Sequence, residues 1–480
     1  MRPLNKTTVQ KPQYPTKVLQ FGSGNFLRAF VDWMIDKAND EGLLNHGIAI
    51  VQATPGSVKS KEVFEKQDCL YHVYLEGIKD KQPIKEVSLI KSITDIVNPY
   101  TDYKKYEELF LRDELEIIVS NTTEAGIRYE EGDDLNAAPP KSFPAQITAL
   151  LYKRYQKFNG ARHKGLSILC CELIEDNGST LREYVIRHAQ DNNLGSDFIE
   201  WVANANYFYD TLVDRIVPGF PKANIEEIKA EIGFDDNLLV KGEYFHVWAI
   251  GGDSSIRQKL PLDQIGLNVL FMDDIRPFRS KKVRVLNGAH TAMVPVGLQM
   301  GVETVKEAFD NTLVEQFIKR MVEEEVLPAI GEDLEELRAF ADKILERFYN
   351  PYLKHYLKDI ALNSLSKWET RNWPTIVDNY TKRGKIASFT AFSFAALLVM
   401  YSGKSEIAFE PRDVQDAVSL IQSTFDCNNI SGWVSKILQD ASIWREKLNT
   451  IPGFEEEVTR GVEAILNNGM KQALSQWLQD

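Results

Sequence analysis

A change of hydrophobic period near residue 275 constrains the fold of this chain more than any other feature of its sequence. Before that point, short apolar runs alternate with segments of helical period, which predicts βαβ units around a mainly parallel sheet. After it, nearly every segment has helical period. We therefore predict an α/β chain with a Rossmann-like N-terminal domain, residues 1–275, followed by a mainly α-helical C-terminal domain, residues 276–480.

The individual elements follow from the same patterns. An amphipathic helix is predicted over Asn25–Asp40, directly after the first strand. Apolar runs predict buried strands over Lys17–Phe21, Gly47–Ala53, Leu115–Asn121, Leu166–Leu173 and Glu243–Ile250. The clearest helical segments of the second domain are residues 311–327, 333–348, 387–401, 411–425 and 453–468.

Charge, cysteine content and hydropathy exclude several classes of protein. A formal net charge of −13 disfavours a nucleic-acid-binding surface and favours a role with small molecules. The four cysteines lack metal-ligand spacing, which indicates a reduced, cytoplasmic compartment. The N-terminus lacks the apolar segment of a signal peptide, and the longest apolar stretch, Phe389–Tyr401, is too short to span a bilayer. The oligomeric state is left open.

The first predicted strand runs directly into the segment FGSGNFLRAF. In a dinucleotide-binding turn, the first glycine permits the tight turn and the second lets the backbone approach a pyrophosphate. Gly22 and Gly24 match these positions, whereas Leu27 replaces the third glycine and the second strand ends in Gln52 instead of an acid. We predict a cofactor site here, with an ordinary strand–helix turn as the alternative, and leave NAD or NADP open. The predicted cofactor-binding residues are Phe21, Gly22, Ser23, Gly24, Asn25 and Phe26.

A second polar turn, TTEAG, follows the strand predicted over Leu115–Asn121. The carboxyl ends of parallel strands lie at the edge of the sheet where ligands of such folds bind. We therefore add Thr123 and Glu124 to the cofactor site. The alternative is an ordinary helix N-cap with an acid in its first turn.

Three polar residues lie in the segment that opens the helical domain: Lys282, Asn287 and His290. On an α-helix of 100° per residue they point at about 0°, 140° and 80°, which places them within one broad face. Gly288 is expected to break the helix, and this brings the three groups closer together. A lysine, an amide and an imidazole can polarise a carbonyl and move a proton. The alternative is a solvated basic helix turn around Lys282.

Several segments, taken in order, resemble the mannitol dehydrogenase family of polyol-specific long-chain dehydrogenases. They are GxGxFxRAF, TEAG, LVDRIVP, ExFxxW, K-x4-N-x2-H and RFYNP, and they extend over nearly the whole chain. The resemblance implies a metal-independent hydride transfer between NAD and a secondary alcohol. It also implies that Lys282 is the general acid/base, that Asn287 polarises the substrate oxygen, and that His290 and Asp214 bind substrate.

One segment departs from the family pattern. The family has a second asparagine that polarises the substrate oxygen, in a pattern like CDNxxxNG. This chain has CELIEDNG, with Leu173 in the asparagine's place. Either that donor is lost, or Asn177 or another group replaces it.

The variant CELIEDNG and the segment KWETR favour, within the family, a member that reduces a keto-uronate. Its carboxylate requires a cation in the pocket, ideally an arginine. Arg347 is the first candidate because it matches the family's RFxNP element, and Lys367 and Arg371 follow; Lys354 and His355 are weaker candidates. Fructuronate, mannitol or a sugar phosphate are alternative substrates, and a nucleotide-binding regulator is a disfavoured alternative. The scattered histidines predict no metal site.

Overall fold

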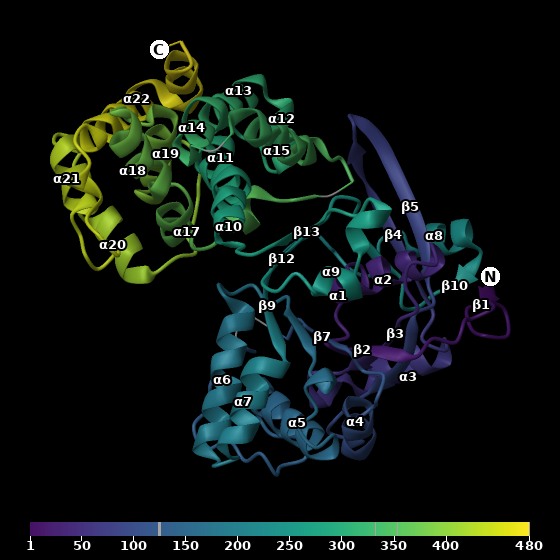
Figure 1. The fold of residues 1–480 in the computed structure, drawn as a ribbon. Coiled ribbons are helices and arrows are strands. Elements are labelled where there is room, and N and C mark those ends of the chain that lie inside the picture. Colours follow the sequence, from purple (N-terminus) through teal and green to yellow (C-terminus); the bar gives the residue numbers. More distant parts are fainter. Residues whose placement is uncertain (123–125, 332, 353, 480) are drawn as a thin grey trace. The chain divides into compact units, whose positions relative to one another are not determined.

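The computed structural model describes residues 1–480 except 123–125, 332, 353 and 480. The chain forms two compact units (Figure 1). The first contains Met1–Gly77 and Pro83–Arg276, and the second contains Ile78–Gln82 and Pro277–Asp480. Because compactness does not establish independent folding, the domain ranges 1–275 and 276–480 remain a proposal.

The first unit is built on an eight-stranded sheet. Its strand order is β6-β3-β2-β7-β8-β9-β12-β13, and every neighbouring pair is parallel except β9 with β12. From β6 to β9 this is the 3-2-1-4-5-6 order of a Rossmann fold, which confirms the predicted fold class. The strands are β2 (Thr16–Phe21), β3 (Gly47–Val51), β6 (Ile93–Val97), β7 (Ile117–Ser120), β8 (Ser167–Cys170), β9 (Tyr207–Asp214), β12 (Val247–Gly251) and β13 (Val269–Met272).

Both faces of this sheet are buried, which explains the continuous apolar runs of its strands. Val18 of β2 packs into one core cluster and its neighbour Leu19 packs into another. In the same way, Ile117 of β7 packs into the first of these clusters and Ile118 packs into the second. Alternate side chains of a strand point to opposite faces, so a strand covered on both sides must be apolar throughout.

Helices of the first unit connect these strands, and one prediction about them is wrong. The helix predicted over Asn25–Asp40 is two helices, because Phe30 has non-helical backbone angles (φ −128°, ψ −81°). Its ring is buried and lies 5.7 Å from that of Trp248. The helices are α1 (Asn25–Arg28), α2 (Val31–Asp40), α3 (Val58–Lys66), α4 (Tyr103–Phe110), α5 (Phe143–Lys157), α6 (Asn177–Asp191), α7 (Ser196–Ala205), α8 (Ile225–Ile232) and α9 (Ile256–Lys259), with 3₁₀ turns at Pro55–Ser57, Arg162–Lys164 and Leu262–Ile265.

Two smaller sheets were not predicted. One has the order β11-β4-β5, and the other pairs β1 with β10. The strand predicted over Glu243–Ile250 is also divided, because β11 ends at Glu243 and β12 begins at Val247. The bounds are β1 (Arg2–Pro3), β4 (Tyr71–Lys79), β5 (Gln82–Ile90), β10 (Phe234–Asp235) and β11 (Val240–Glu243).

The second unit is helical, as predicted. Its central helix α19 (Ser388–Tyr401) is buried from Phe389 to Tyr401 and packs on α22 (Phe454–Trp477). No helix within the described part of the chain is long and apolar enough to cross a membrane. The other helices are α10 (Arg276–Lys282), α11 (Ala289–Gln299), α12 (Val305–Asp310), α13 (Thr312–Arg320), α14 (Leu327–Ile330), α15 (Leu334–Glu346), α16 (Leu357–Ile360), α17 (Ser364–Arg371), α18 (Trp373–Arg383), α20 (Gln415–Ser423) and α21 (Ile430–Leu438), with π-helical segments η4 (Val283–Gly288) and η5 (Met321–Val326) and 3₁₀ turns η6 (Arg347–Tyr349) and Leu448–Thr450.

Candidate functional site

The glycine turn after β2 needs its two glycines for different reasons. Gly22 has a φ of +124°, and a Cβ there would lie 3.0 Å from the carbonyl oxygen of Asn121. Gly24 caps the N-terminus of α1, and a Cβ there would meet no atom of the described residues within 4 Å. The conformation of the turn therefore requires Gly22, whereas Gly24 leaves open space beside the backbone. Such space suits the approach of a cofactor phosphate.

The other residues predicted at this turn occupy different environments. Phe21 is 2% exposed, and its ring packs edge-on against Tyr106 and Phe143, so its side chain belongs to the core. Asn25 accepts a hydrogen bond at Oδ1 from Arg28 (2.7 Å), and Phe26 stacks on Phe30 at 4.8 Å. Ser23 is half-buried at the tip of the turn. The backbone of the turn, more than these side chains, faces the open space.

Buried polar groups support the turn from below. Gln20 is fully buried and donates from Nε2 to the carbonyl oxygen of Gly22 (3.1 Å). Asp32 accepts a hydrogen bond from the Tyr71 hydroxyl (2.6 Å), and burial raises the pKa of Asp32 to about 7. Arg28 donates to the carbonyl oxygen of Leu238 (2.6 Å). These contacts fix the turn without using its outward-facing backbone groups.

The end of the second strand carries an amide where many dinucleotide-binding domains carry an acid. Gln52 is fully buried, and its Nε2 donates to the carbonyl oxygen of Ser57 (2.9 Å) and to the hydroxyl of Ser60 (2.8 Å). Its Oε1 accepts from Asn98 (3.2 Å). Gln52 therefore organises the following loop, and both of its amide hydrogens are used within the protein.

The turn after β7 reveals a residue that the sequence analysis missed. Thr123 and Glu124, both predicted in the cofactor site, lie outside the described residues. Glu172 is 3% exposed and accepts from the backbone N–H and the hydroxyl of Thr122, both at 3.0 Å. It also accepts from the hydroxyl of Ser120 (3.1 Å). Glu172 thus joins the ends of β7 and β8, and an acid placed directly after a buried strand was the available signal.

The structure excludes one replacement for the second polarising asparagine. Asn177 is fully buried, and its Nδ2 donates to the carbonyl oxygens of Glu172 (2.9 Å) and Thr211 (3.1 Å). Its Oδ1 accepts from the backbone N–H groups of Gly178 and Thr211, both at 2.9 Å. Asn177 therefore has no donor left for a substrate oxygen. Leu173, at the position of the missing asparagine, is 69% exposed.

Lys282, Asn287 and His290 occupy a helix whose geometry differs from the prediction. Gly288 does not break it, because its backbone angles are helical (φ −63°, ψ −47°). Instead, the π-helical segment η4 lies between α10, which ends at Lys282, and α11, which begins at Ala289. Hydrogen bonds in a π-helix join residues five apart. Asn287 therefore lies one full turn after Lys282, and not about 140° away as on an α-helix. His290, three residues further, shares the same face.

Contacts from α17 and α18 hold this π-turn. Arg284 is 6% exposed and donates to the carboxylate of Asp378 (2.6 Å), the carbonyl oxygen of Pro374 (3.1 Å) and the hydroxyl of Thr375 (3.3 Å). The amide of Asn372 donates to the carbonyl oxygen of Gly288 (3.2 Å). The π-turn is therefore stabilised by a distant part of the sequence.

His290 lies among positive charges. It is 8% exposed, its ring stacks on Phe348 at 4.4 Å, and its Nε2 has no hydrogen-bond partner among the described residues. Burial lowers the pKa of His290 well below its usual value, and the charges of His355, Arg347, Arg371 and Lys282 lower it further, in that order. The imidazole is therefore neutral at neutral pH, with a buried nitrogen available to a ligand.

The predicted carboxylate-binding residues divide between two environments. Arg347 begins η6 and is close enough to lower the pKa of both His290 and His355. Arg371 ends α17 and donates to the hydroxyl of Thr291 (3.2 Å). Lys367 donates to the carbonyl oxygen of Ile360 (2.9 Å). Arg347 and Arg371 therefore accompany the lysine–asparagine–histidine set.

Asp214 is the one predicted substrate residue in the first unit. It is half-buried and ends β9, at the carboxyl edge of the parallel part of the sheet. Each unit therefore carries part of the predicted site: the glycine turn and Asp214 in the first, and the π-turn with its basic neighbours in the second. Within the described residues, no cluster of three or more His, Cys, Asp or Glu side chains is arranged to hold a metal ion.

Comparison with known proteins agrees with this arrangement. Residues 16–264 match the mannitol dehydrogenase Rossmann domain, and residues 274–466 match the mannitol dehydrogenase C-terminal domain. The altronate oxidoreductase of Bacillus subtilis (strain 168) is 42% identical over 479 residues, which cover 99% of this chain and 98% of that protein. An altronate oxidoreductase of Escherichia coli (O7:K1, strain IAI39 / ExPEC) is 38% identical over 483 residues, 99% of each chain.

Two solved structures share the fold over nearly the whole chain. A substrate-free D-sorbitol dehydrogenase has a TM-score of 0.83 at 21% identity, covering 99% of this chain and 100% of that one. A ternary complex of Pseudomonas fluorescens mannitol 2-dehydrogenase with NAD and D-mannitol has a TM-score of 0.70 at 22% identity, covering 98% and 95%. Together with the family matches, they confirm the predicted fold and enzyme class: the chain belongs to the mannitol dehydrogenase family of oxidoreductases.

Proposed function

We propose that the protein catalyses the reversible reduction of tagaturonate to altronate, with NADH as the hydride donor. The observation that carries the proposal is the basic surroundings of His290: Arg371 donates to the hydroxyl of the adjacent Thr291 (3.2 Å), and Arg347 precedes Phe348, whose ring stacks on His290 at 4.4 Å. A keto-uronate carries a carboxylate that such a basic pocket binds, whereas a neutral polyol needs no fixed cation. The full-length similarity to altronate oxidoreductases supports the same substrate.

The cofactor is NAD. The first unit is the family's Rossmann domain, and the mannitol 2-dehydrogenase of the same fold was solved with NAD. The open space beside Gly24 fits a dinucleotide pyrophosphate at this turn. When bound, the reduced nicotinamide supplies the hydride to the ketone carbon.

In the proposed mechanism, residues in and beside the π-turn stabilise the negative charge on the ketone oxygen and transfer a proton to it. Negative charge builds on the ketone oxygen as hydride arrives, and the Asn287 amide donates a hydrogen bond to that oxygen. Lys282 then gives the oxygen a proton, and in the oxidation direction it removes that proton. The unpartnered Nε2 of His290 binds a neighbouring hydroxyl of the substrate. Arg347 holds the carboxylate, with Lys367, Arg371 and Asp214 completing the substrate-binding set.

We propose that this chemistry needs no metal ion, because Lys282 supplies the proton and Asn287 stabilises the oxygen. Prolonged treatment with a chelator should leave turnover unchanged. Loss of activity that added zinc restores would contradict this part of the proposal. We further propose a cytoplasmic enzyme of hexuronate breakdown, in keeping with four free cysteines.

A panel of substrates tests the proposed function directly. NADH oxidation is measured with tagaturonate, fructuronate, fructose and fructose 6-phosphate at equal concentrations. We expect kcat/KM for tagaturonate to exceed that for the neutral ketose by at least about 100-fold, the discrimination available to a site that pairs a buried charge. A preference for fructuronate, fructose or fructose 6-phosphate would assign the enzyme to one of the alternative substrates instead.

Arg347→Leu isolates the carboxylate contact. It should raise KM for tagaturonate at least about tenfold while leaving KM for fructose unchanged, because a charged hydrogen bond contributes about 1.5–3 kcal/mol. The exposed Lys358→Leu serves as a matched control that removes a surface charge. Equal effects of Arg347→Leu on both substrates would mean that Arg347 is structural.

A further inference from the structure

A second imidazole lies beside the proposed substrate-binding histidine. The ring of His355 is 5.1 Å from that of His290 and nearly perpendicular to it, at 77°. The backbone fixes His355 independently of its ring, because its carbonyl oxygen accepts from the N–H of Val305 (3.0 Å). This ring, one of the weaker candidates for the carboxylate-binding cation, lies in the basic neighbourhood of His290.

Charged groups from several elements act on the two imidazoles. Burial lowers the pKa of His355 below its usual value, the charge of Arg347 from η6 lowers it further, and Asp359 from α16 acts in the opposite direction. His290 on α11 is affected by His355, Arg347, Arg371 from α17 and Lys282 from α10. Both rings are therefore neutral at neutral pH, since each added positive charge would be repelled by the guanidinium groups.

We propose that His355 is a specificity-determining residue that takes up a proton from solvent when a carboxylate-bearing substrate binds beside Arg347. The carboxylate adds a negative charge beside the ring, and the protonated ring then donates a charged hydrogen bond to it. A neutral sugar brings no such charge and leaves His355 unprotonated. The proton returns to solvent when the acidic product leaves, so it does not enter the balance of the reaction. This inference rests on the proposed function.

The sign of the pH dependence follows from linkage. Protonation of His355 and binding of the carboxylate favour each other, so affinity for the acid rises as the pH falls through the pKa of the complex. It levels off below the lower pKa of the free enzyme. One proton taken up changes affinity by at most about tenfold per pH unit. Titration of Lys282 affects the KM values of acidic and neutral substrates alike, so its effect cancels in the ratio of the two KM values.

Two variants separate the charge of His355 from its shape. His355→Gln keeps a hydrogen-bond donor but cannot titrate, and His355→Phe keeps a ring against His290 but has no donor. KM for tagaturonate and for fructose is measured from pH 5 to pH 8 with the NADH-bound enzyme. In the wild type, the ratio of KM for fructose to KM for tagaturonate should rise at least about threefold as the pH falls, within the limit set by one proton. His355→Gln should abolish this rise, and His355→Phe should also raise KM for tagaturonate at every pH.

Calorimetry supplies a readout that does not depend on turnover. Altronate is titrated into the NADH-bound enzyme in two buffers of different ionisation enthalpy, which measures protons taken up on binding. We expect net uptake in the wild type and in the exposed control Lys358→Gln, and none in His355→Gln; melting temperatures confirm that the variants fold. Uptake that persists in His355→Gln, or a KM ratio insensitive to pH in the wild type, overturns the proposal for His355. A wild type that reduces fructose but not tagaturonate would instead refute the proposed function.

Discussion

The two units each place function on an irregular turn, and the two turns are specified differently. The glycine turn of the first unit is specified locally, because Gly22 has a φ of +124° that other residues rarely adopt. The π-turn η4 consists of residues that an ordinary α-helix accepts, and Arg284 holds it through contacts with α18. A local backbone requirement can be recognised in a sequence, whereas a conformation supported by distant contacts cannot.

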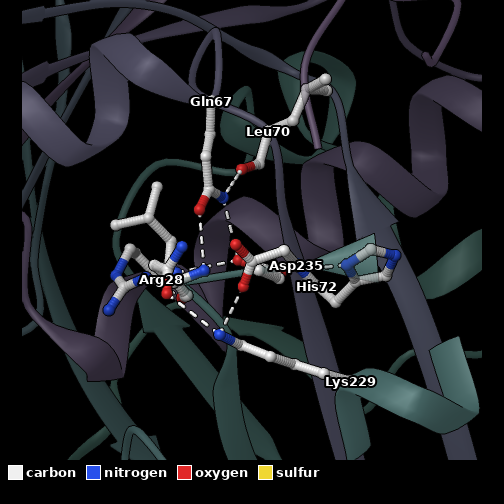
Figure 2. Close-up of polar contacts among 9 residues, drawn as sticks. Arg28, Gln67, Leu70, His72, Lys229 and Asp235 are labelled. Carbon is white, nitrogen blue, oxygen red and sulfur yellow. Dashed lines mark hydrogen bonds and ion pairs between the residues drawn. The ribbon is translucent and has the colours of Figure 1, made fainter. Parts of the chain in front are cut away.

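Both units hold buried polar groups that are bonded within the protein and others that have no partner among the described residues. Figure 2 shows a bonded set in the first unit, around Gln67, His72 and Lys229. Asp236 accepts there from His72 (2.9 Å) and Gln67 (2.9 Å), and Lys229 donates to Asp235 (2.6 Å). In the second unit, Nε2 of His290 is buried without a partner among the described residues. Closed networks stabilise a fold, whereas a buried nitrogen without a partner is available to a ligand.

The largest expected effect tests whether Lys282, which precedes the π-turn, is the proton donor of the reaction. Lys282→Ala should lower kcat at least about 100-fold with NADH affinity nearly unchanged, because a positioned proton donor typically contributes 10²–10⁴-fold. Lys281→Ala, the neighbouring lysine of the same helix, should have little effect. The measurement is steady-state NADH oxidation together with a fluorescence titration of NADH. Similar rates for the two variants would favour the solvated basic helix over a catalytic lysine.

Substitutions of the two glycines of the first unit test whether the glycine turn binds the cofactor and whether its backbone requires glycine. Gly24→Val should weaken NADH binding at least about tenfold without lowering the melting temperature, because its side chain fills space left for the cofactor. Gly22→Val should instead lower the melting temperature, since a side chain there is strained at positive φ and crowds Asn121. Cofactor titration and thermal unfolding distinguish these outcomes. Unchanged NADH binding by Gly24→Val would move the cofactor away from this turn.

Breaking the support of the π-turn should cost less activity than removing its lysine. Arg284→Met removes the hydrogen bonds to Asp378, Pro374 and Thr375. We expect kcat to fall about tenfold with NADH affinity unchanged, because a small displacement of Lys282 relative to Asn287 misaligns the proton transfer. Arg383→Met, an exposed arginine of α18, is the matched control. If both variants retain full kcat, the π-turn does not depend on Arg284.

These contrasts show which parts of the molecule the sequence could predict. The apolar strands β2, β3, β7 and β8 were predicted because strands buried on both faces must be apolar throughout. The sheet β11-β4-β5 was missed, since β5 alternates exposed and buried residues and its turn residues, Asp80 and Lys81, have positive φ without a glycine. A pattern of residue types gave no sign of a turn held by tertiary contacts.

The candidate site shows the same limit. The spacing of Lys282, Asn287 and His290 indicated that they share a face, but the angle assigned to Asn287 was wrong because η4 is π-helical. Glu172 was not assigned a role and His355 was only a weaker candidate for the carboxylate-binding cation, since their importance depends on what surrounds them: the hydroxyls of Ser120 and Thr122 in one case, the ring of His290 in the other. Such surroundings exist only after the chain has folded.

The smallest expected effect concerns one buried carboxyl in each unit. Burial raises the pKa of Asp32 below the glycine turn and of Glu325 in η5, each to about 7. Glu325 accepts from the backbone N–H groups of Phe389 (2.7 Å) and Thr390 (2.9 Å) at the start of α19. Both folded-state values lie above the usual 3.8 and 4.5 of the unfolded chain. Stability from these groups is therefore fully present below about pH 4 and is lost as the pH rises through 7.

Removing either carboxyl should weaken the dependence of folding stability on pH. In Asp32→Asn and Glu325→Gln, the decrease in melting temperature between pH 5 and pH 8 should be smaller than in the wild type, because an amide does not titrate there. The exposed Glu323→Gln should leave the slope unchanged. Scanning calorimetry at four pH values measures it. A slope that stays the same in Glu325→Gln would mean that this carboxylate remains ionised at neutral pH, stabilised by the amides of α19 as a helix N-terminus stabilises any anion.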